Sequence, residues 1–170
     1  MISCISLTSC FSTSKLISKS ESKSIEFSIK KLNGIYSNQI ENNEKVGLWN
    51  ILADNKSFKG DWNKVVENSY VKFEMNSETE LKVSLIENDS IIKKMKFKGK
   101  IVNDYFLINK KFLLIPVPVF LILRERKTII ENDAKGNLIL THGYKNGAWF
   151  LVMASDFGGI SSHEFKRIIN

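Results

Sequence analysis

Apolar and polar side chains alternate along most of the chain from about residue 32 onward. A single polar residue separates Val71 from Phe73 and Phe73 from Met75, and the same spacing recurs at 81–85 and 95–101. Alternate side chains of a strand share a face, whereas residues i and i+2 of a helix lie on opposite sides. The pattern therefore predicts strands with one buried and one hydrated face, which is typical of an antiparallel sheet.

Short polar segments separate these runs where hairpin turns are expected. Asn103-Asp104 lies between apolar flanks, and both residue types tolerate the positive φ of a two-residue turn. Asn88-Asp89-Ser90, residues 133–136 and Lys145-Asn146-Gly147 give similar signals. Such short connections predict an all-β, antiparallel up-and-down meander, and closure into a barrel would remove its two exposed edges. Strands are expected near 32–38, 46–53, 69–76, 80–87, 91–102, 105–115, 119–125, 128–132, 137–143 and 147–154.

The most apolar run, residues 112–123, contains Pro116 and Pro118. Proline cannot donate a hydrogen bond to a sheet, so we expect the chain to bend between a strand ending at 115 and one starting at 119. The flanks lack alternation, which predicts that both faces are covered there, with a helix, a ligand or a partner on the outer one. The run has twelve residues, fewer than the roughly 20 of a transmembrane helix.

One short helix is predicted at the C-terminus. Ser161 and Glu164 match the S-x-x-E capping box, and Ile160 and Phe165 occupy the positions of a hydrophobic staple. Gly158-Gly159 would provide a flexible joint before it. A helix this short is marginal alone, so we expect it to dock on the sheet.

The composition fits one folded domain, which we place at residues 32–170. With 43% hydrophobic residues the chain can bury a core, and both cysteines, Cys4 and Cys10, precede that domain. The net charge is +7, but only three of the 25 basic residues are arginine. The lysines are spread along strands and loops, so we expect a solvated surface and no nucleic-acid partner, with at most a mild attraction to anionic lipid headgroups.

The N-terminus carries a candidate export signal. Leu7-Thr8-Ser9-Cys10 resembles the lipobox that precedes lipid attachment in bacterial lipoproteins. Residues 1–9 contain no Lys or Arg and are short for a signal of roughly 7–15 apolar residues, so the start lies upstream or the match is accidental. Residues 1–10 are interpreted as a partial signal with lipid on Cys10, and residues 11–31, rich in Ser and Lys, as a flexible tether. This predicts a membrane-anchored protein of the bacterial cell envelope, on a periplasmic or outer-membrane face.

Gly34-Ile35-Tyr36 adds a family resemblance. A single antiparallel barrel on a lipid tether is similar to the bacterial lipocalin-like lipoproteins, which carry Gly-x-Trp in the first strand. In that family an arginine of a late strand packs across the aromatic ring, and Arg124 or Arg126 is the expected counterpart. The resemblance implies that the barrel holds a small apolar molecule. The alternative is that Gly34 marks a bend and Tyr36 is an ordinary core residue.

The sequence provides few groups for catalysis, and we predict no enzyme, no cofactor and no metal site. The two histidines, His142 and His163, are too few for a typical zinc site, and no G-x-S-x-G elbow is present. His142 is expected on the face of Leu138 and Leu140, as a core or barrel-mouth residue. An envelope hydrolase using His142 and a nearby carboxylate is one alternative; a structural or adhesive module with a filled barrel is another. The candidate ligand-binding residues are Tyr36, Phe58, Trp62 and His142.

Overall fold

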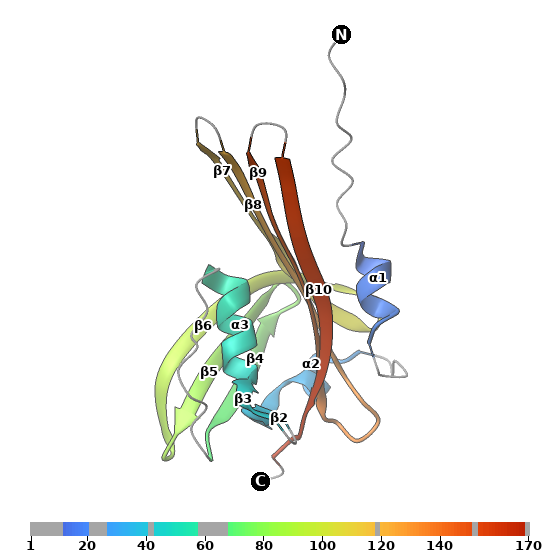
Figure 1. The fold of residues 1–170 in the computed structure, drawn as a ribbon. Helices are drawn as coiled ribbons and strands as arrows, with labels where there is room; N and C mark the ends of the chain where they lie inside the picture. Colours follow the sequence, from blue (N-terminus) through green and yellow to red (C-terminus); the bar gives the residue numbers. More distant parts are fainter. Residues whose placement is uncertain are drawn as a thin grey trace.

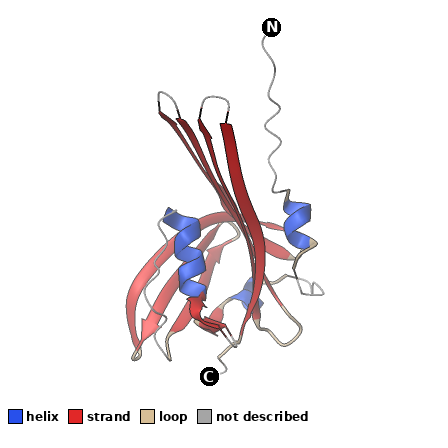
Figure 2. Ribbon diagram, in the orientation of Figure 1, coloured by secondary structure: helices blue, strands red, loops and turns tan. Residues whose placement is uncertain are grey.

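The computed structural model describes residues 12–20, 27–40, 43–57, 68–117, 120–150 and 153–168 (Figures 1 and 2). An antiparallel sheet of eight strands, in the order β1-β4-β5-β6-β7-β8-β9-β10, makes up most of this part of the chain, and β2 pairs with β3. No helix among these residues is both long and apolar enough to cross a membrane. The helices are α1 (Thr13–Ile17), α2 (Ile29–Leu32) and α3 (Leu48–Ser57); the strands are β1 (Gly34–Ser37), β2 (Gln39–Ile40), β3 (Asn43–Gly47), β4 (Tyr70–Ser77), β5 (Glu80–Glu87), β6 (Ser90–Val102), β7 (Tyr105–Val117), β8 (Phe120–Asn132), β9 (Leu138–Phe150) and β10 (Met153–Phe165).

The predicted meander is confirmed from β4 to β10, because each of these strands pairs with the next one along the chain. Asn88, Asp89 and Asn103 adopt positive φ angles of 47°, 59° and 51° at the hairpin turns. Gly136, with φ of 84°, ends the turn between β8 and β9. The turn predicted at Lys145-Asn146-Gly147 is wrong, since these residues lie inside β9 with β8 on one side and β10 on the other. Pairing on both sides overrides the local turn preference.

Among the described residues a single bridge joins the two edges of the eight-stranded sheet, so the sheet is not closed into a barrel along its length. Tyr36 of β1 is bridged to Arg167, which follows β10. Two backbone hydrogen bonds of 2.8 Å hold the bridge, from Ser37 N to the Lys166 oxygen and from Ile168 N to the Ile35 oxygen. The edges are therefore tied together at the end of the molecule where the chain terminates (Figure 1).

Helix α3 lies on the concave side of the sheet (Figure 1). It replaces the strand that was predicted near residues 46–53. Leu48, Ile51 and Leu52 follow helical spacing and belong to the main apolar cluster, with Trp49 beside them. The start of the helix is held by a distant residue: Asn38 accepts from Leu48 N through its backbone oxygen and from Trp49 N through its side chain, at 2.9 and 2.8 Å. This cap comes from ten residues upstream, so the local pattern around 46–53 did not reveal it.

The predicted C-terminal helix is also wrong, because residues up to Phe165 form β10 and pair with β9 along its whole length. Ser161 and Ser162 lie opposite His142 and Thr141, and the Ser162 and Thr141 hydroxyls are 2.9 Å apart. Phe165 is completely buried in the main apolar cluster. Thirteen paired positions and one buried aromatic outweigh a four-residue capping signal.

Two parts of the segment expected to be a tether are folded. Helix α1 buries Leu16 completely against Tyr105 and Ile129, on the face of the sheet opposite α3. Lys127 Nζ donates to Thr13 Oγ1 at 2.6 Å. The folded part of the chain therefore begins before residue 32, at least as early as α1.

Candidate functional site

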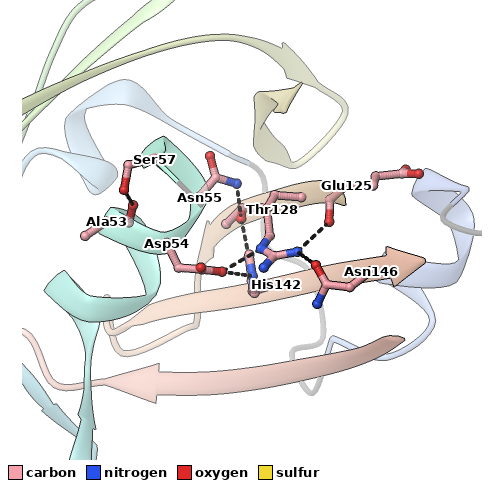
Figure 3. Close-up of polar contacts among 9 residues, drawn as sticks. Ala53, Asp54, Asn55, Ser57, Glu125, Thr128, His142 and Asn146 are labelled. Carbon is pink, nitrogen blue, oxygen red and sulfur yellow. Dashed lines mark hydrogen bonds and ion pairs between the residues drawn. The ribbon is translucent and has the colours of Figure 1, made fainter. Parts of the chain in front are cut away.

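Helix α3 brings a carboxylate to the concave face of the sheet (Figure 3). Asp54 Oδ2 lies 2.6 Å from Nε of Arg126 on β8 and 3.6 Å from Nε2 of His142 on β9. The Asp54 and Arg126 side chains are only 13% and 8% exposed, so water screens their attraction weakly. Asp54 therefore connects the helix to two neighbouring strands, to β8 through the ion pair with Arg126 and to β9 through His142.

The other ring nitrogen of His142 faces a threonine. Thr128 Oγ1 lies 2.8 Å from His142 Nδ1 and accepts a hydrogen bond from Asn55 Nδ2, also at 2.8 Å. Because its oxygen accepts from Asn55, the hydroxyl proton of Thr128 is available for Nδ1. A neutral His142 that accepts this proton at Nδ1 would carry its own proton on Nε2, which faces Asp54.

Asp54 is stabilised as a carboxylate. Burial raises its pKa, but hydrogen bonds from His142 and Arg126, together with the Arg126 charge, outweigh burial and hold that pKa below its ordinary value. At neutral pH the site therefore contains a negative Asp54 whose charge is matched by Arg126.

The rings of Tyr144 and Phe157 and the side-chain amide of Asn146 continue the contacts around Asp54 along β9 and β10. The Tyr144 ring stacks on His142 with centroids 6.5 Å apart, and the Arg126 guanidinium lies 5.6 Å from the Tyr144 centroid. Phe157 of β10 meets Tyr144 edge-on at 6.5 Å. We call the polar part of this group the Asp54 cluster; its members are Asp54, Asn55, Arg126, Thr128, His142 and Asn146.

A pocket of about 530 Å³ opens directly beside the Asp54 cluster, on the concave face of β8, β9 and β10. This volume falls within the roughly 300–1,000 Å³ of small-molecule sites. Polar and apolar groups share the wall, and Arg124 is an exposed cation that has no ion-pair partner among the described residues. The lining residues are Asp54, Ile122, Leu123, Arg124, Arg126, Asn146, Gly147, Ala148, Ser155 and Phe157.

The Asp54 cluster has the composition of a catalytic triad but a different accessibility. Thr128, His142 and Asp54 follow one another at 2.8 and 3.6 Å. Thr128 has no exposed surface, and Asp54 is engaged by Arg126. Among the described residues no group of three His, Cys, Asp or Glu side chains could hold a metal ion. The contacts seen here serve to hold α3 and to shape the pocket floor.

Tyr36 lies in a second cluster, at the bridged edges of the sheet. Its ring is completely buried and its hydroxyl lies 2.9 Å from the Leu32 carbonyl oxygen and 3.2 Å from Asn132 Nδ2. Burial raises the pKa of Tyr36 despite opposite effects of Asn132 and Arg167, so the phenol stays neutral. Without exposed surface, Tyr36 contributes nothing to the wall of the pocket.

The arginine that packs across Tyr36 is Arg167, and not Arg124 or Arg126 as expected. Its guanidinium lies 5.7 Å from the ring centroid and donates to the carbonyls of Lys31 and Asn33, at 2.6 and 2.7 Å. These carbonyls end helix α2, so Arg167 satisfies acceptors that the helix leaves free. A Cβ on Gly34 would approach Arg167 Nη2 to 2.8 Å, so a larger residue there would require the guanidinium to move.

Of the candidate residues, the structure describes Tyr36 and His142 and assigns them to different clusters. His142 is buried as expected, and it has the carboxylate neighbour that the hydrolase alternative required. Cys10, Phe58, Trp62 and Pro118 lie outside the described residues, and His163 belongs to β10 instead of a helix. The sequence alone indicated no site role for Asp54, Asn146 or Arg167. One signal was available: Arg126 and Thr128 occupy alternate strand positions with the apolar Ile130, which places two polar side chains on a face that also carries a core residue.

No protein-family model, curated protein or solved structure matches the chain.

Proposed function

We propose that the protein is a non-catalytic, lipocalin-like binding protein that holds a small molecule with an apolar body and one polar group. The observation that carries this proposal is the pocket of about 530 Å³ beside the Asp54 cluster. Ile122, Ala148 and Phe157 would contact the apolar body, while the exposed Arg124 is suited to a negatively charged group. Arg126 is less available, because Asp54 already neutralises it.

The cluster around Tyr36 supports the lipocalin-like part of the proposal. Gly34 leaves room for Arg167 to cross the Tyr36 ring, in the way an arginine crosses the first-strand aromatic of that family. The bridge between β1 and the residues after β10 also favours a barrel-like closure of the meander. In this chain the arginine follows the last strand instead of lying within it.

A titration with 11-(dansylamino)undecanoic acid tests the binding function. We expect saturable fluorescence enhancement and, for Ala148→Trp, at least tenfold weaker binding, because the indole would fill the pocket next to Ile122. Ala134→Trp is the matched control, since Ala134 is exposed in the turn between β8 and β9, and its affinity should match the wild type. Absence of saturable binding, or equal binding by the Ala148→Trp variant, would contradict the proposal.

A structural or adhesive module is the second candidate, and helix α3 favours it. Leu48, Ile51 and Leu52 fill the concave side that a carrier would leave open for its ligand. The same titration separates the two functions, because a filled module would not bind the dansyl probe.

We also propose that lipid on Cys10 anchors the protein to a bacterial envelope, which rests on the lipobox-like Leu7-Thr8-Ser9-Cys10. When the gene is expressed with its upstream sequence in bacteria fed radiolabelled palmitate, the wild type should carry the label. The label should disappear in Cys10→Ala and remain in Cys4→Ala, the matched control. An unlabelled wild type, or equal labelling of Cys10→Ala, would refute attachment at Cys10.

A further inference from the structure

Strands β7 to β10 project beyond the rest of the sheet (Figure 1). The sequence of their far ends is almost entirely apolar. The strand register aligns Leu114, Leu123, Gly147 and Asp156 in one row, and three further rows follow toward the hairpin ends. Only Ser155 and Asp156 have polar side chains in these four rows. We call this part the apolar end; it consists of residues 114–117, 120–123, 147–150 and 153–156.

Large apolar side chains are exposed on both faces of the apolar end. Leu114 and Ile115 are consecutive strand residues, so they point to opposite faces, and they are 46% and 39% exposed. Phe150 on β9 is exposed to a similar extent. The described helices α1 and α3 lie below this region in Figure 1. Large apolar side chains exposed on two faces of one sheet mark an interaction surface.

The two-faced exposure identifies the kind of partner. A second copy that adds at the edge of β7 or β10 leaves both faces uncovered, and a protein stacked on one face leaves the other uncovered. A lipid bilayer surrounds an inserted segment and covers both faces together.

Cations flank the apolar end on both sides, as contact with anionic headgroups requires. Arg124 lies one row below it on the concave face and is exposed. On the opposite face Lys15 of α1 and Lys19, two residues after that helix, line a hollow together with Lys145, which is also paired with Asp156 at 3.1 Å. Each basic residue near an anionic surface contributes attraction, and these residues lie where the headgroups would be.

The length of the apolar end fits one leaflet. Four residues per strand at about 3.3 Å each span about 13 Å, close to the ~15 Å that is half of a bilayer core. In the described part of the chain, β6 pairs with β7 only as far as Ile108, so the later residues of β7 have no strand on that edge. Its free backbone groups would be costly in the middle of a membrane, which favours shallow insertion over spanning.

We propose that the apolar end of β7–β10 inserts into the surface leaflet of an anionic lipid bilayer, with Arg124, Lys15 and Lys19 at headgroup level. This contact does not depend on the lipid on Cys10. It adjoins the pocket and shares Ile122, Ala148 and Arg124 with the pocket wall.

Vesicle sedimentation of the full chain carrying Cys10→Ser, which cannot be lipidated at that position, tests the proposal. We expect binding to phosphatidylcholine vesicles with one quarter phosphatidylglycerol, and at least tenfold weaker binding by Leu114→Ser/Ile115→Ser. The matched control is Ile91→Ser/Ile92→Ser, since Ile91 and Ile92 are also consecutive strand residues with 48% and 46% exposure. This control should bind within twofold of the parent chain.

A charge variant tests the headgroup contact. Arg124→Gln should weaken binding to the anionic vesicles about fivefold and leave binding to pure phosphatidylcholine unchanged. Equal weakening on both kinds of vesicle would contradict the assignment of Arg124 to the headgroup level.

Tryptophan quenching keeps the proposal testable if the serine variants fail to fold. Brominated lipids should quench the fluorescence of the Cys10→Ser chain through Trp149 in the apolar end, and Trp149→Phe should abolish this quenching. The proposal is overturned by unchanged quenching in Trp149→Phe, by equal vesicle binding of the two serine variants, or by concentration-dependent dimerisation without vesicle binding.

Discussion

Replacing Arg126 with alanine should destabilise the protein by about 3 kcal/mol, because it strands the Asp54 carboxylate at the interface between α3 and the sheet. This is the lower end of the range for breaking a buried ion pair, since Asp54 keeps 13% exposure and His142 lies 3.6 Å away. The Asn146 side-chain oxygen and the Glu125 carbonyl oxygen would also each lose the hydrogen bond from Arg126 Nη1, which lies 3.0 Å from both. Urea unfolding followed by circular dichroism would measure the loss.

A double-mutant cycle separates the ion pair from the other contacts of Arg126. Asp54→Ala/Arg126→Ala should be less destabilised than the sum of the two single variants, because removing both charges leaves neither one stranded. Additive losses would contradict a direct coupling of Asp54 to Arg126.

The same ion pair predicts how stability responds to acid. The pKa of Asp54 is lower in the folded protein than the roughly 3.9 of an unfolded aspartate, so its stabilising contribution is present above that value. The contribution is lost as the pH falls from about 4 through the folded pKa. Between pH 4 and pH 2 the wild type should therefore lose more stability than Asp54→Asn does.

Truncating Leu52 to alanine should cost about 2–5 kcal/mol, because the side chain is completely buried where α3 packs on the concave face. The cavity would open between the helix and residues such as Val71 and Phe73 of β4. Ile92→Ala is the control, since Ile92 is 46% exposed on β6 and its loss should stay within about 0.5 kcal/mol. Chemical unfolding of both variants checks the difference, and equal losses would contradict a core built on α3.

The sequence predicted the strands from β4 to β7 well because their information is local. Alternation at Val71, Phe73 and Met75 and turn residues such as Asn103 act within one hairpin. The errors share a different cause. Helix α3 begins on a cap supplied by Asn38, and β10 replaces a predicted helix because it pairs with β9 over thirteen positions. Contacts between distant residues decide both segments, and no window of the sequence contains them.

The candidate site shows the same difference between what local sequence predicts and what contacts between distant residues decide. His142 was recognised as a buried residue of a strand, but its partners Asp54 and Thr128 come from α3 and β8. The Arg167 contact with Tyr36 joins residues 131 positions apart. An arginine late in the chain was expected at this ring, but Arg124 or Arg126 was predicted in place of Arg167. A family resemblance indicated the type of contact, and only the tertiary structure identified the residue that makes it.

The most direct test of the proposed binding function is an NMR titration of the ¹⁵N-labelled full chain carrying Cys10→Ser with undecanoic acid. We predict that the amide signals of Ile122, Asn146, Ala148 and Phe157 shift together and saturate, while those of Val83 and Leu85 in the filled part of the core stay unchanged. Shifts confined to residues 112–117, or no saturable shift at all, would contradict a ligand site beside the Asp54 cluster.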